Sequence, residues 1–316
     1  METKADVCIS AIICTYRNPH YLKGAIRSLL NQTLPANQYE IIVVDNNSQD
    51  ETPEIVHHLS TETDLIVRYV KETRRGLSNA RNSGIEAAQG DIVAFLDDDA
   101  EAESSWLSNL LDAYKEPNIW AAGGKLLPLW HIDERPDWLT EEYVTWLSLL
   151  DQGDQSRPLT WPERILGANF SFRKSIFPIV GYFDPTLGRK GTALLGHEDT
   201  ELQQRIHKNG KLVYYVANAI VYHHVPAERV TERYFLRRQY GASRSQVALL
   251  LKQQGFLPTL RQVLRQVIVL AKRSLMIIQL ILFRKRPIPF NHKRMFYAHL
   301  GQIVGFLESL LNLSKL

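Results

Sequence analysis

Disulfide chemistry is almost absent from this 316-residue chain, which contains only two cysteines, Cys8 and Cys14. Both lie in or directly after an apolar run, and two cysteines cannot make a disulfide framework. Reduced, buried thiols are typical of the cytoplasm, so we expect a cytoplasmic protein. Residues 1–6 are polar and lead directly into a strand-like run, so we expect no secretory leader at this end.

Long hydrophobic runs and glycine-rich loops are also lacking. The longest apolar stretch lies near residues 275–283 and is interrupted by Gln279. It supplies about half of the roughly 20 residues that a membrane-spanning helix needs, so we expect no such helix. No GxGxxG motif follows the first strand-like run, which disfavours a nicotinamide-dependent dehydrogenase.

Charge is present in ordinary amount but is distributed unevenly. Hydrophobic residues make up 45% of the chain and charged residues 22%, as in ordinary globular domains. Residues 257–316 contain ten Lys or Arg and one acid, a net charge of +9. The remainder contains 27 basic and 33 acidic residues, a net charge of −6. The C-terminal part therefore forms a separate basic region.

The apolar pattern predicts an α/β fold. Short apolar runs, typical of buried parallel strands, cover residues 7–13, 39–44, 65–70 and 91–96. Helical spacing lies between them, over residues 22–30, from Thr52 onward and over residues 78–89. A further helix is expected at 199–208 and a strand or strand pair at 211–222. Strands that alternate with helices indicate a doubly wound, mainly parallel sheet.

Polar residues follow three of these runs, namely Thr15, Asp45 and the triplet Asp97-Asp98-Asp99. Ligands of a doubly wound sheet bind beyond the carboxyl ends of its strands. Three adjacent carboxylates repel one another unless a cation lies among them, and carboxylate oxygens suit Mg²⁺ or Mn²⁺. The alternative is a solvated acidic turn, but placement at a strand end favours a metal site.

Five ordered segments resemble family 2 of the inverting glycosyltransferases, which have the GT-A fold. They are CTYRN (14–18) with SLLNQ (28–32), IVVDNNS (42–48), GLSNARNSGI (76–85) with FLDDD (95–99), GANFSFR (167–173) and GHEDTEL (196–202). Together they cover residues 7 to about 225. The resemblance implies a Rossmann-like GT-A sheet, with a helical extension at the C-terminus.

The resemblance also implies a role for each matching residue. The nucleotide-sugar-binding positions would be Thr15, Tyr16, Asp45, Arg75, Arg81, Asp97 and Asp98. Among them, Asp97 would lie near the ribose and Arg75 would act as a helper. Asp99 would be the main ligand of Mg²⁺ or Mn²⁺. Asn169 and Arg173, in the GANFSFR segment, would lie on the acceptor side.

The catalytic base implied by the resemblance is Asp199, with its neighbour Glu198 as the alternative. Asp199 would remove the proton of the acceptor hydroxyl while that oxygen attacks the anomeric carbon in a single in-line displacement. Read without the resemblance, two acids in a first helical turn are also explained by the helix dipole. The two explanations are compatible.

Two histidines follow the apolar residues 219–222. His223 resembles a histidine that some family members add to the metal shell, and His224 is its competitor. The alternative for either is a polar residue at the end of a strand. The tryptophans between residues 130 and 161 suit sugar stacking, although packing is the commoner role of such side chains.

The basic region predicts helices with mixed character. Apolar residues recur there at helical spacing, with Arg261, Arg265, Lys272 and Arg273 between them, up to a break at residues 283–287. This pattern is typical of helices on an anionic membrane, here the inner face of the plasma membrane. The alternative is a helical subdomain packed on the catalytic domain or on a second subunit of a homo-oligomer. No nucleic-acid-binding module accompanies the cations, so we expect no nucleic acid partner.

These patterns together predict a catalytic domain over residues 1–230 and a basic helical extension over 231–316. Residues 1–100 would bind the nucleotide sugar and 101–230 the acceptor, a saccharide or a lipid-linked hydroxyl in cell-envelope or exopolysaccharide assembly. A sugar-phosphate nucleotidyltransferase is an alternative, but no glycine-rich loop follows the first strand and no glycine occurs before Gly24. A non-catalytic sugar-nucleotide-binding protein is the third candidate, which the presence of both acidic motifs disfavours.

Overall fold

A computed structural model describes residues 7–191, 193–284 and 288–313. Residues 1–6 and three cations of the predicted basic region, Lys285, Arg286 and Lys315, lie outside the described residues. The chain divides into two compact units. The first contains Met1–His131, Leu147–Pro185 and Asp199–Val225, and the second contains Ile132–Trp146, Thr186–Glu198 and Pro226–Leu316. The predicted domain boundary at residue 230 stays a prediction, and two short segments before it group with the C-terminal helices.

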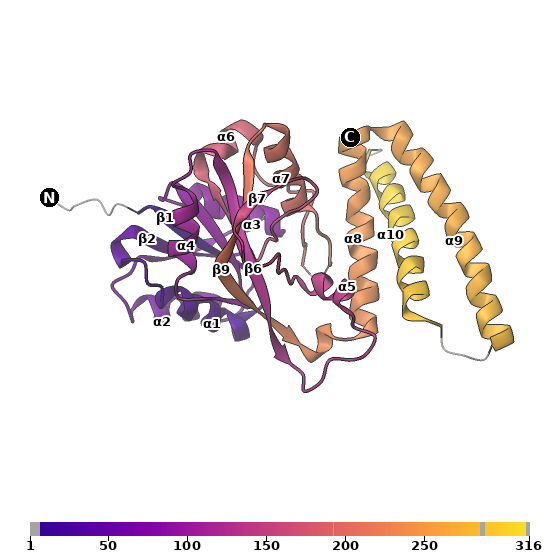
Figure 1. The fold of residues 1–316 in the computed structure, drawn as a ribbon, viewed down its shortest axis with the longest axis horizontal. Coiled ribbons are helices and arrows are strands. Elements are labelled where there is room, and N and C mark those ends of the chain that lie inside the picture. The colour runs from indigo at the N-terminus through magenta and orange to yellow at the C-terminus, as the bar shows by residue number, and fades with distance from the viewer. Residues whose placement is uncertain (1–6, 192, 285–287, 314–316) are drawn as a thin grey trace. The chain divides into compact units, whose positions relative to one another are not determined.

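The first unit is built on one sheet, which has nine strands among the described residues (Figure 1). Its strands are β1 (Ile9–Thr15), β2 (Tyr39–Asp45), β3 (Val67–Lys71), β4 (Ile92–Asp97), β5 (Ala100–Ala102), β6 (Ile119–His131), β7 (Arg157–Leu159), β8 (Asn169–Arg173) and β9 (Leu212–Pro226). Its helices are α1 (Pro19–Leu30), α2 (Thr52–Ser60), α3 (Leu77–Ala87), α4 (Trp106–Ala113), α6 (Phe177–Val180) and α7 (Glu198–Lys208).

The N-terminal half of this sheet is parallel, in the order β3-β2-β1-β4. Both faces are covered, because alternate side chains of each strand enter different clusters. Ile9 and Ile13 of β1 pack with residues of α1, α2 and α4, whereas Ile12 packs with α3 on the other face. The sequences of these strands therefore show no alternation of apolar and polar residues, as is usual for strands buried on both faces. The predicted doubly wound α/β sheet is confirmed.

The second half of the sheet is antiparallel. It continues from β4 through β8, β6 and β9 to β5, and β7 pairs with β9. Strand β8 runs opposite to β4, with Asn169 beside Leu96 and Arg173 beside Ile92. This reversal decides which residues of the GANFSFR segment can reach the carboxyl edge of the parallel strands.

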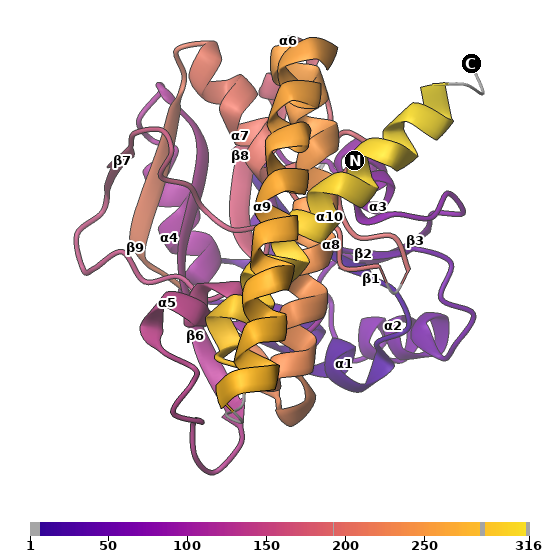
Figure 2. The same cartoon turned by 90° about the vertical axis from the view of Figure 1, so that its right-hand side faces the viewer.

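The second unit contains the predicted C-terminal helices, α8 (Glu232–Gln254), α9 (Phe256–Arg284) and α10 (Phe290–Leu313), which lie side by side (Figures 1 and 2). Two glycines of α10 allow close packing on α8, because a Cβ at Gly301 or Gly305 would lie 2.5 or 2.3 Å from a backbone oxygen of α8. The short α5 (Glu141–Val144) belongs to the same unit. Trp138 packs against Phe235 and Phe290, so its role here is packing.

No helix within the described part of the chain combines the length and the apolar character that crossing a bilayer requires.

Candidate active site

The carboxyl ends of β1, β2 and β4 meet at one edge of the sheet. The strand register places Thr15 beside Asp45 and Cys14 beside Asp97. Thr15 and Asp45 are both buried. The structure thus brings together the polar residues that follow three separate apolar runs, as the alternation of strands and helices predicts.

Asp98 is held by two hydrogen bonds from residues at the end of β1. The Thr15 hydroxyl donates to its Oδ2 at 2.7 Å, and the Asn18 amide donates to its Oδ1 at 2.9 Å. Burial, followed by the negative charge of Asp99, raises the pKa of Asp98 to about 7 despite these two bonds. Asp98 therefore connects the aspartate triplet to β1, and its raised pKa reflects burial beside another carboxylate.

Asp97, Asp99 and His223 form a group suited to a metal ion. Each offers one ligand atom, and these atoms all lie within 4.8 Å of one another. Asp99 is 5% exposed and His223 is 2% exposed, with 3.3 Å between Asp99 Oδ1 and His223 Nε2. The Nδ1 of His223 is buried and has no hydrogen-bond partner. Two carboxylates and an imidazole fit a divalent cation such as Mn²⁺ or Mg²⁺.

His223 joins this group because β9 pairs with β5. The register places His223 beside Ala100, directly after Asp99. Successive strand residues point to opposite faces, and the side chain of His224 makes other contacts. Its Nε2 lies 3.0 Å from Glu101 Oε1, and its Nδ1 lies 2.8 Å from His131 Nε2. Because neighbouring residues of β9 point to opposite faces, His223 faces the aspartates and His224 does not.

Arg81, on α3, is a buried cation beside the aspartates. Its Nη2 lies 3.8 Å from Asp97 Oδ1 and donates to the Gly167 carbonyl at 3.3 Å. The guanidinium also packs over the rings of Phe170 and Phe183, at 4.8 and 5.4 Å from their centroids. A side chain at Gly167 would collide with this arginine, because a Cβ there would lie 2.6 Å from Nη2. Arg81 therefore has a fixed place next to the strand ends.

The thiol of Cys14 lies at the same edge, but it is unsuited to nucleophilic chemistry. Burial raises its pKa to about 12, an effect that Asp97 and Asp98 increase and Arg81 opposes. The thiolate is the reactive form of cysteine, and this side chain stays protonated near neutral pH.

Asp45 and its neighbour Asn46 organise two loops beside the edge. Asp45 Oδ1 accepts from the Ser48 amide at 2.8 Å, and Oδ2 accepts from the Tyr69 hydroxyl at 2.7 Å. Asn46 accepts from the Gly76 amide at 2.7 Å and donates to the Arg74 carbonyl at 2.8 Å. Asn46 and Tyr69 were not singled out from sequence, and the only signal was their position at or near a strand end.

The two remaining predicted donor contacts are more exposed. Arg75 lies on the loop between β3 and α3 and is exposed, and Tyr16 is half-buried directly after β1. The guanidinium carbon of Arg17 lies 5.4 Å from the centre of the Tyr16 ring. Both predicted residues therefore flank the edge rather than entering the aspartate group.

The predicted base motif forms the start of α7. Glu198 is buried and is the first residue of the helix, and Asp199 is half-buried. Asp199 Oδ1 accepts from the Thr200 amide at 2.6 Å. The helix is fixed by Gln203, whose side-chain amide exchanges hydrogen bonds of 3.0 and 2.9 Å with the backbone of Ile165.

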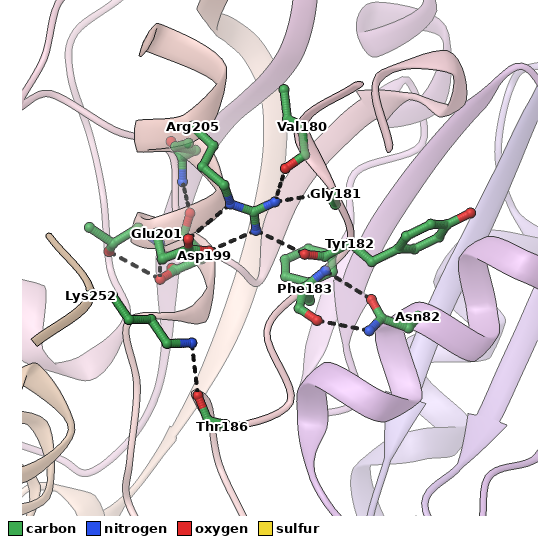
Figure 3. Close-up of polar contacts among 12 residues, drawn as sticks. Asn82, Val180, Gly181, Tyr182, Phe183, Thr186, Asp199, Glu201, Arg205 and Lys252 are labelled. Atoms are coloured by element: carbon green, nitrogen blue, oxygen red, sulfur yellow. Dashed lines mark hydrogen bonds and ion pairs between the residues drawn. The ribbon is translucent and has the colours of Figure 1, made fainter. Parts of the chain in front are cut away.

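Arg205 of α7 binds the backbone that precedes Phe183 (Figure 3). It donates to the carbonyls of Val180, Gly181 and Tyr182 and pairs with Glu201 at 2.7 Å. Asn82 of α3 exchanges two hydrogen bonds with the backbone of Phe183, of 2.8 and 3.0 Å. The backbone that Arg205 of α7 binds therefore leads directly into Phe183, whose ring contacts Arg81 beside Asp97.

Asn169 does not present a free side chain to an acceptor. It is fully buried, accepts from Trp106 Nε1 at 2.8 Å and donates to the carbonyls of Lys125 and Ala219, both at 2.8 Å. These bonds join β8 to α4, β6 and β9. The contacts of Asn169 are therefore structural, and its predicted acceptor role has no support in this geometry.

Arg173 is not brought to the site. It pairs with Ile92 at the amino end of β4, the end opposite to Asp97. Its guanidinium donates to the carbonyls of Ile119, Tyr114 and Glu116 at 2.8, 2.6 and 3.0 Å. The antiparallel direction of β8 explains this placement, which the expected position on the acceptor side did not take into account.

Glycosyltransferases are among the known proteins whose sequences are similar to this chain. The family model described as Glycosyl transferase family 2 matches residues 10–177. The glucosyl-dolichyl phosphate glucuronosyltransferase of Haloferax volcanii is 30% identical over 219 residues, 68% of each chain. The succinoglycan biosynthesis protein ExoM of Rhizobium meliloti is 26% identical over 75% of this chain and 74% of its own. A Campylobacter jejuni GalNAc(5)-diNAcBac-PP-undecaprenol beta-1,3-glucosyltransferase is 36% identical over 38% of each chain.

Solved structures agree on the fold. The mannosyltransferase PcManGT of Pyrobaculum calidifontis, in complex with GDP-Man and Mn²⁺, superposes with a TM-score of 0.62 at 17% identity. The match covers 96% of this chain and 87% of that one. GalNAc-T7 with UDP, GalNAc and Mn²⁺ gives a TM-score of 0.55 at 17% identity, over 76% of this chain and 51% of that one. The fold is therefore the GT-A fold with a C-terminal helical region.

Proposed function

This chain belongs to glycosyl transferase family 2, and we propose that it transfers a sugar, with inversion, from a nucleotide diphosphate to a hydroxyl of a lipid-linked saccharide. The observation that carries the proposal is the group of Asp97, Asp99 and His223 at the carboxyl edge of the sheet, in which Asp99 and His223 are buried. A binding edge of this kind suits a nucleotide diphosphate, and α7 supplies a carboxylate at its first turn.

The donor would lie along the edge formed by β1, β2 and β4. Asp97, Asp99 and His223 would hold Mg²⁺ or Mn²⁺, with Asp98 fixed behind them by Thr15 and Asn18. When bound, such an ion stabilises the charge of a departing diphosphate. The nucleoside would lie against Thr15, Tyr16, Asp45, Arg75 and Arg81.

Asp199 would act as the base. Its carboxylate would accept the proton of the acceptor hydroxyl while that oxygen attacks the anomeric carbon from the face opposite to the leaving group. One displacement of this kind inverts the anomeric configuration. Glu198 is the alternative base, and it is the more buried of the two acids.

Relatives that handle lipid-linked sugars support the proposed acceptor class. Two of the names given above specify a dolichyl phosphate and an undecaprenyl diphosphate carrier, and a third names succinoglycan biosynthesis. A hydrophobic carrier would place the reaction at a membrane surface, and cytoplasmic nucleotide sugars would place it on the inner face of the plasma membrane.

Helix α9 presents a surface suited to that location. Four of its leucine and isoleucine side chains, separated by seven, four and seven residues, are more than half exposed: Leu257, Leu264, Ile268 and Leu275. We call them the α9 stripe. Arg261, Arg265 and Lys272 are exposed at neighbouring positions, and the 29 residues of α9 include no acid. An apolar stripe edged by cations fits the interface of an anionic bilayer. A second copy of the chain is the competing occupant.

The proposed activity is tested by incubating the full chain with UDP, GDP and dTDP, each with and without Mn²⁺, and recording thermal unfolding. We expect one nucleotide to stabilise the chain only when Mn²⁺ is present, and its sugar conjugates then define the donors for transfer assays. Release of pyrophosphate from a nucleoside triphosphate and a sugar phosphate would instead identify a nucleotidyltransferase. Donor binding without transfer to any lipid-linked acceptor would favour a non-catalytic role.

A further inference from the structure

The predicted base is preceded by an irregular segment that belongs to the C-terminal helical unit. Thr186–Glu198 groups with Pro226–Leu316 rather than with the sheet. The Gly188 amide donates to the Gly196 carbonyl at 3.3 Å, which brings these two residues together. Leu187 is fully buried. We call the described residues 186–191 and 193–197 the 186–197 loop.

One face of α8 holds this loop through three polar contacts. The Gly196 amide donates to Ser245 Oγ at 3.2 Å, and His197 Nε2 donates to the Ala242 carbonyl at 3.0 Å. At the other end of the loop, Lys252 Nζ donates to Thr186 Oγ1 at 3.2 Å (Figure 3). Residues 242, 245 and 252 are spaced so that they lie along one side of a helix. Both ends of the loop are therefore attached to α8.

A glycine of α8 makes the contact between loop and helix close. A Cβ at Gly241 would lie 2.3 Å from the Leu194 carbonyl oxygen, a backbone atom that cannot move aside independently of the loop. Glycine within a helix lowers stability, so its presence there is best explained where two segments of backbone approach closely. The position of Gly241 therefore indicates that α8 is shaped to receive the loop.

The last residue of the loop is held in an uncommon backbone conformation. His197 has φ +76°, in the left-handed region that only a few per cent of non-glycine residues adopt, although histidine is found there more often than most. It directly precedes Glu198, the first residue of α7. Such a conformation persists only where the surroundings hold it. The bond from His197 to Ala242 is one such restraint, so α8 influences the direction in which the chain enters α7.

We propose that α8 positions the catalytic base through the 186–197 loop, with Gly241, Ser245 and His197 as positioning residues for Asp199. The inference rests on the proposed function. A small displacement of a reacting group lowers the rate steeply, whereas the donor, held at the sheet edge, binds as before. Loosening the loop should therefore lower kcat and leave donor affinity unchanged.

The attachment of the 186–197 loop to α8 is tested first, by a measurement that does not depend on enzymatic activity. Ser245→Ala removes the acceptor of the Gly196 amide, and Ser245→Thr keeps a hydroxyl at the same place. We expect hydrogen–deuterium exchange in peptides covering residues 186–198 to become about tenfold faster in Ser245→Ala and to return toward the wild-type rate in Ser245→Thr. If the exchange rate of these peptides were unchanged in Ser245→Ala, the loop would not be attached to α8 through Ser245, and the proposal would be wrong.

The positioning role is tested by kinetics. We expect Gly241→Ala and Ser245→Ala to lower kcat about tenfold or more, with the Kd of the nucleotide diphosphate in Mn²⁺ unchanged within about twofold. Gly305→Ala is the matched control, because its Cβ would also meet a backbone oxygen of α8 at 2.3 Å, that of Arg244, which belongs to the α8–α10 contact. It should lower kcat less than Gly241→Ala does.

The outcomes separate this inference from the proposed function. Faster exchange together with an unchanged kcat would show that the loop is seated on α8 but does not position the base. Equal kcat losses in Gly241→Ala and Gly305→Ala would attribute the effect to general loosening of α8, and would overturn the proposal. A wild-type protein that binds donor and transfers no sugar would refute the proposed function, while the exchange results would still stand on their own.

Discussion

The sheet edge and helix α9 depart from the usual distribution of side chains in opposite directions. At the edge, the carboxylate of Asp99 and the imidazole of His223 are buried, whereas on α9 Leu257 and Leu275 are each 63% exposed. Buried charge and exposed apolar surface are the informative exceptions in a globular protein. Under the proposed function, a component outside the chain would resolve each exception: a cation with a diphosphate at the edge, and a lipid surface at α9. The two regions should therefore respond differently to substitution.

The largest effect is expected at the metal group. Asp99→Ala removes a ligand, so Mn²⁺-dependent stabilisation by the nucleotide should vanish and transfer should fall by about a thousandfold or more. EDTA should reproduce this loss in the wild-type protein. Asp91→Ala is the control, because Asp91 is an exposed acid just before β4, at the other end of the strand. If Asp99→Ala kept nucleotide-dependent stabilisation, the metal site would be misassigned.

The base is tested by Asp199→Asn, which keeps the shape of the side chain and removes the proton acceptor. We expect kcat to fall by about 10²–10⁴ while donor affinity is retained, as measured by single-turnover assays and calorimetry. Glu198→Gln is the paired variant. A larger kcat loss in Glu198→Gln than in Asp199→Asn would move the base to Glu198.

Asn169→Ala separates structure from acceptor binding. It leaves the Trp106 indole, the buried Ala219 carbonyl and the partly buried Lys125 carbonyl without their partner, so the free energy of unfolding should fall by about 3 kcal/mol. Urea denaturation measures this change. The KM for the acceptor should stay unchanged, and a raised acceptor KM with unaltered stability would restore the role that the sequence suggested.

The two adjacent histidines give a sharper test of the edge. His223→Ala should weaken Mn²⁺ binding about tenfold to a hundredfold, measured by calorimetry in the presence of nucleotide. His224→Ala should change it by less than about threefold, because that side chain faces Glu101 and His131. Equal losses in the two variants would contradict the strand parity on which the assignment depends.

The smallest effects are expected on α9. Arg265→Gln should weaken binding to vesicles containing anionic lipid about fivefold, as one cation near such a surface contributes about 1 kcal/mol. Leu264→Glu should weaken it further, and added salt should reduce the binding of the wild-type protein. Sedimentation with neutral and anionic vesicles measures these changes. Absence of vesicle binding, together with a dimer that Leu264→Glu dissociates, would assign the α9 stripe to a second copy of the chain.

Much of the fold could be predicted from sequence. The strand-like run at 39–44 became β2 (Tyr39–Asp45), and the helical spacing at 78–89 became α3 (Leu77–Ala87). Both elements could be predicted because their signals lie in neighbouring residues. Apolar residues recur at different intervals in strands and helices, and each of these two elements ends at or near a polar residue or a glycine. The positions of Thr15, Asp45 and Asp97 at one edge followed from the parallel arrangement, which alternation of strands and helices favours.

Other parts of the site required contacts between distant residues. Asn169 and Arg173 stand in one matching segment, but β8 runs antiparallel to β4, so the strand carries them to opposite ends. Asn18 and Tyr69 were missed because their partners, Asp98 and Asp45, lie far away in sequence. The hold of α8 on the 186–197 loop was equally invisible, since nothing in the residues near Ser245 indicates a partner at Gly196.

By itself, the sequence determined the order of the strands and helices in the first hundred residues, the acidic triplet at a strand end and the basic character of the C-terminal region, because these depend on neighbours within a few residues. Tertiary structure decided that His223 rather than His224 faces the aspartates, that Asp98 turns toward Thr15, and that α8 carries the loop leading to Asp199. Those outcomes depend on the pairing register and the direction of the strands. A shift of one residue in register, or a reversal of a strand, would change them without changing the sequence pattern of any single strand.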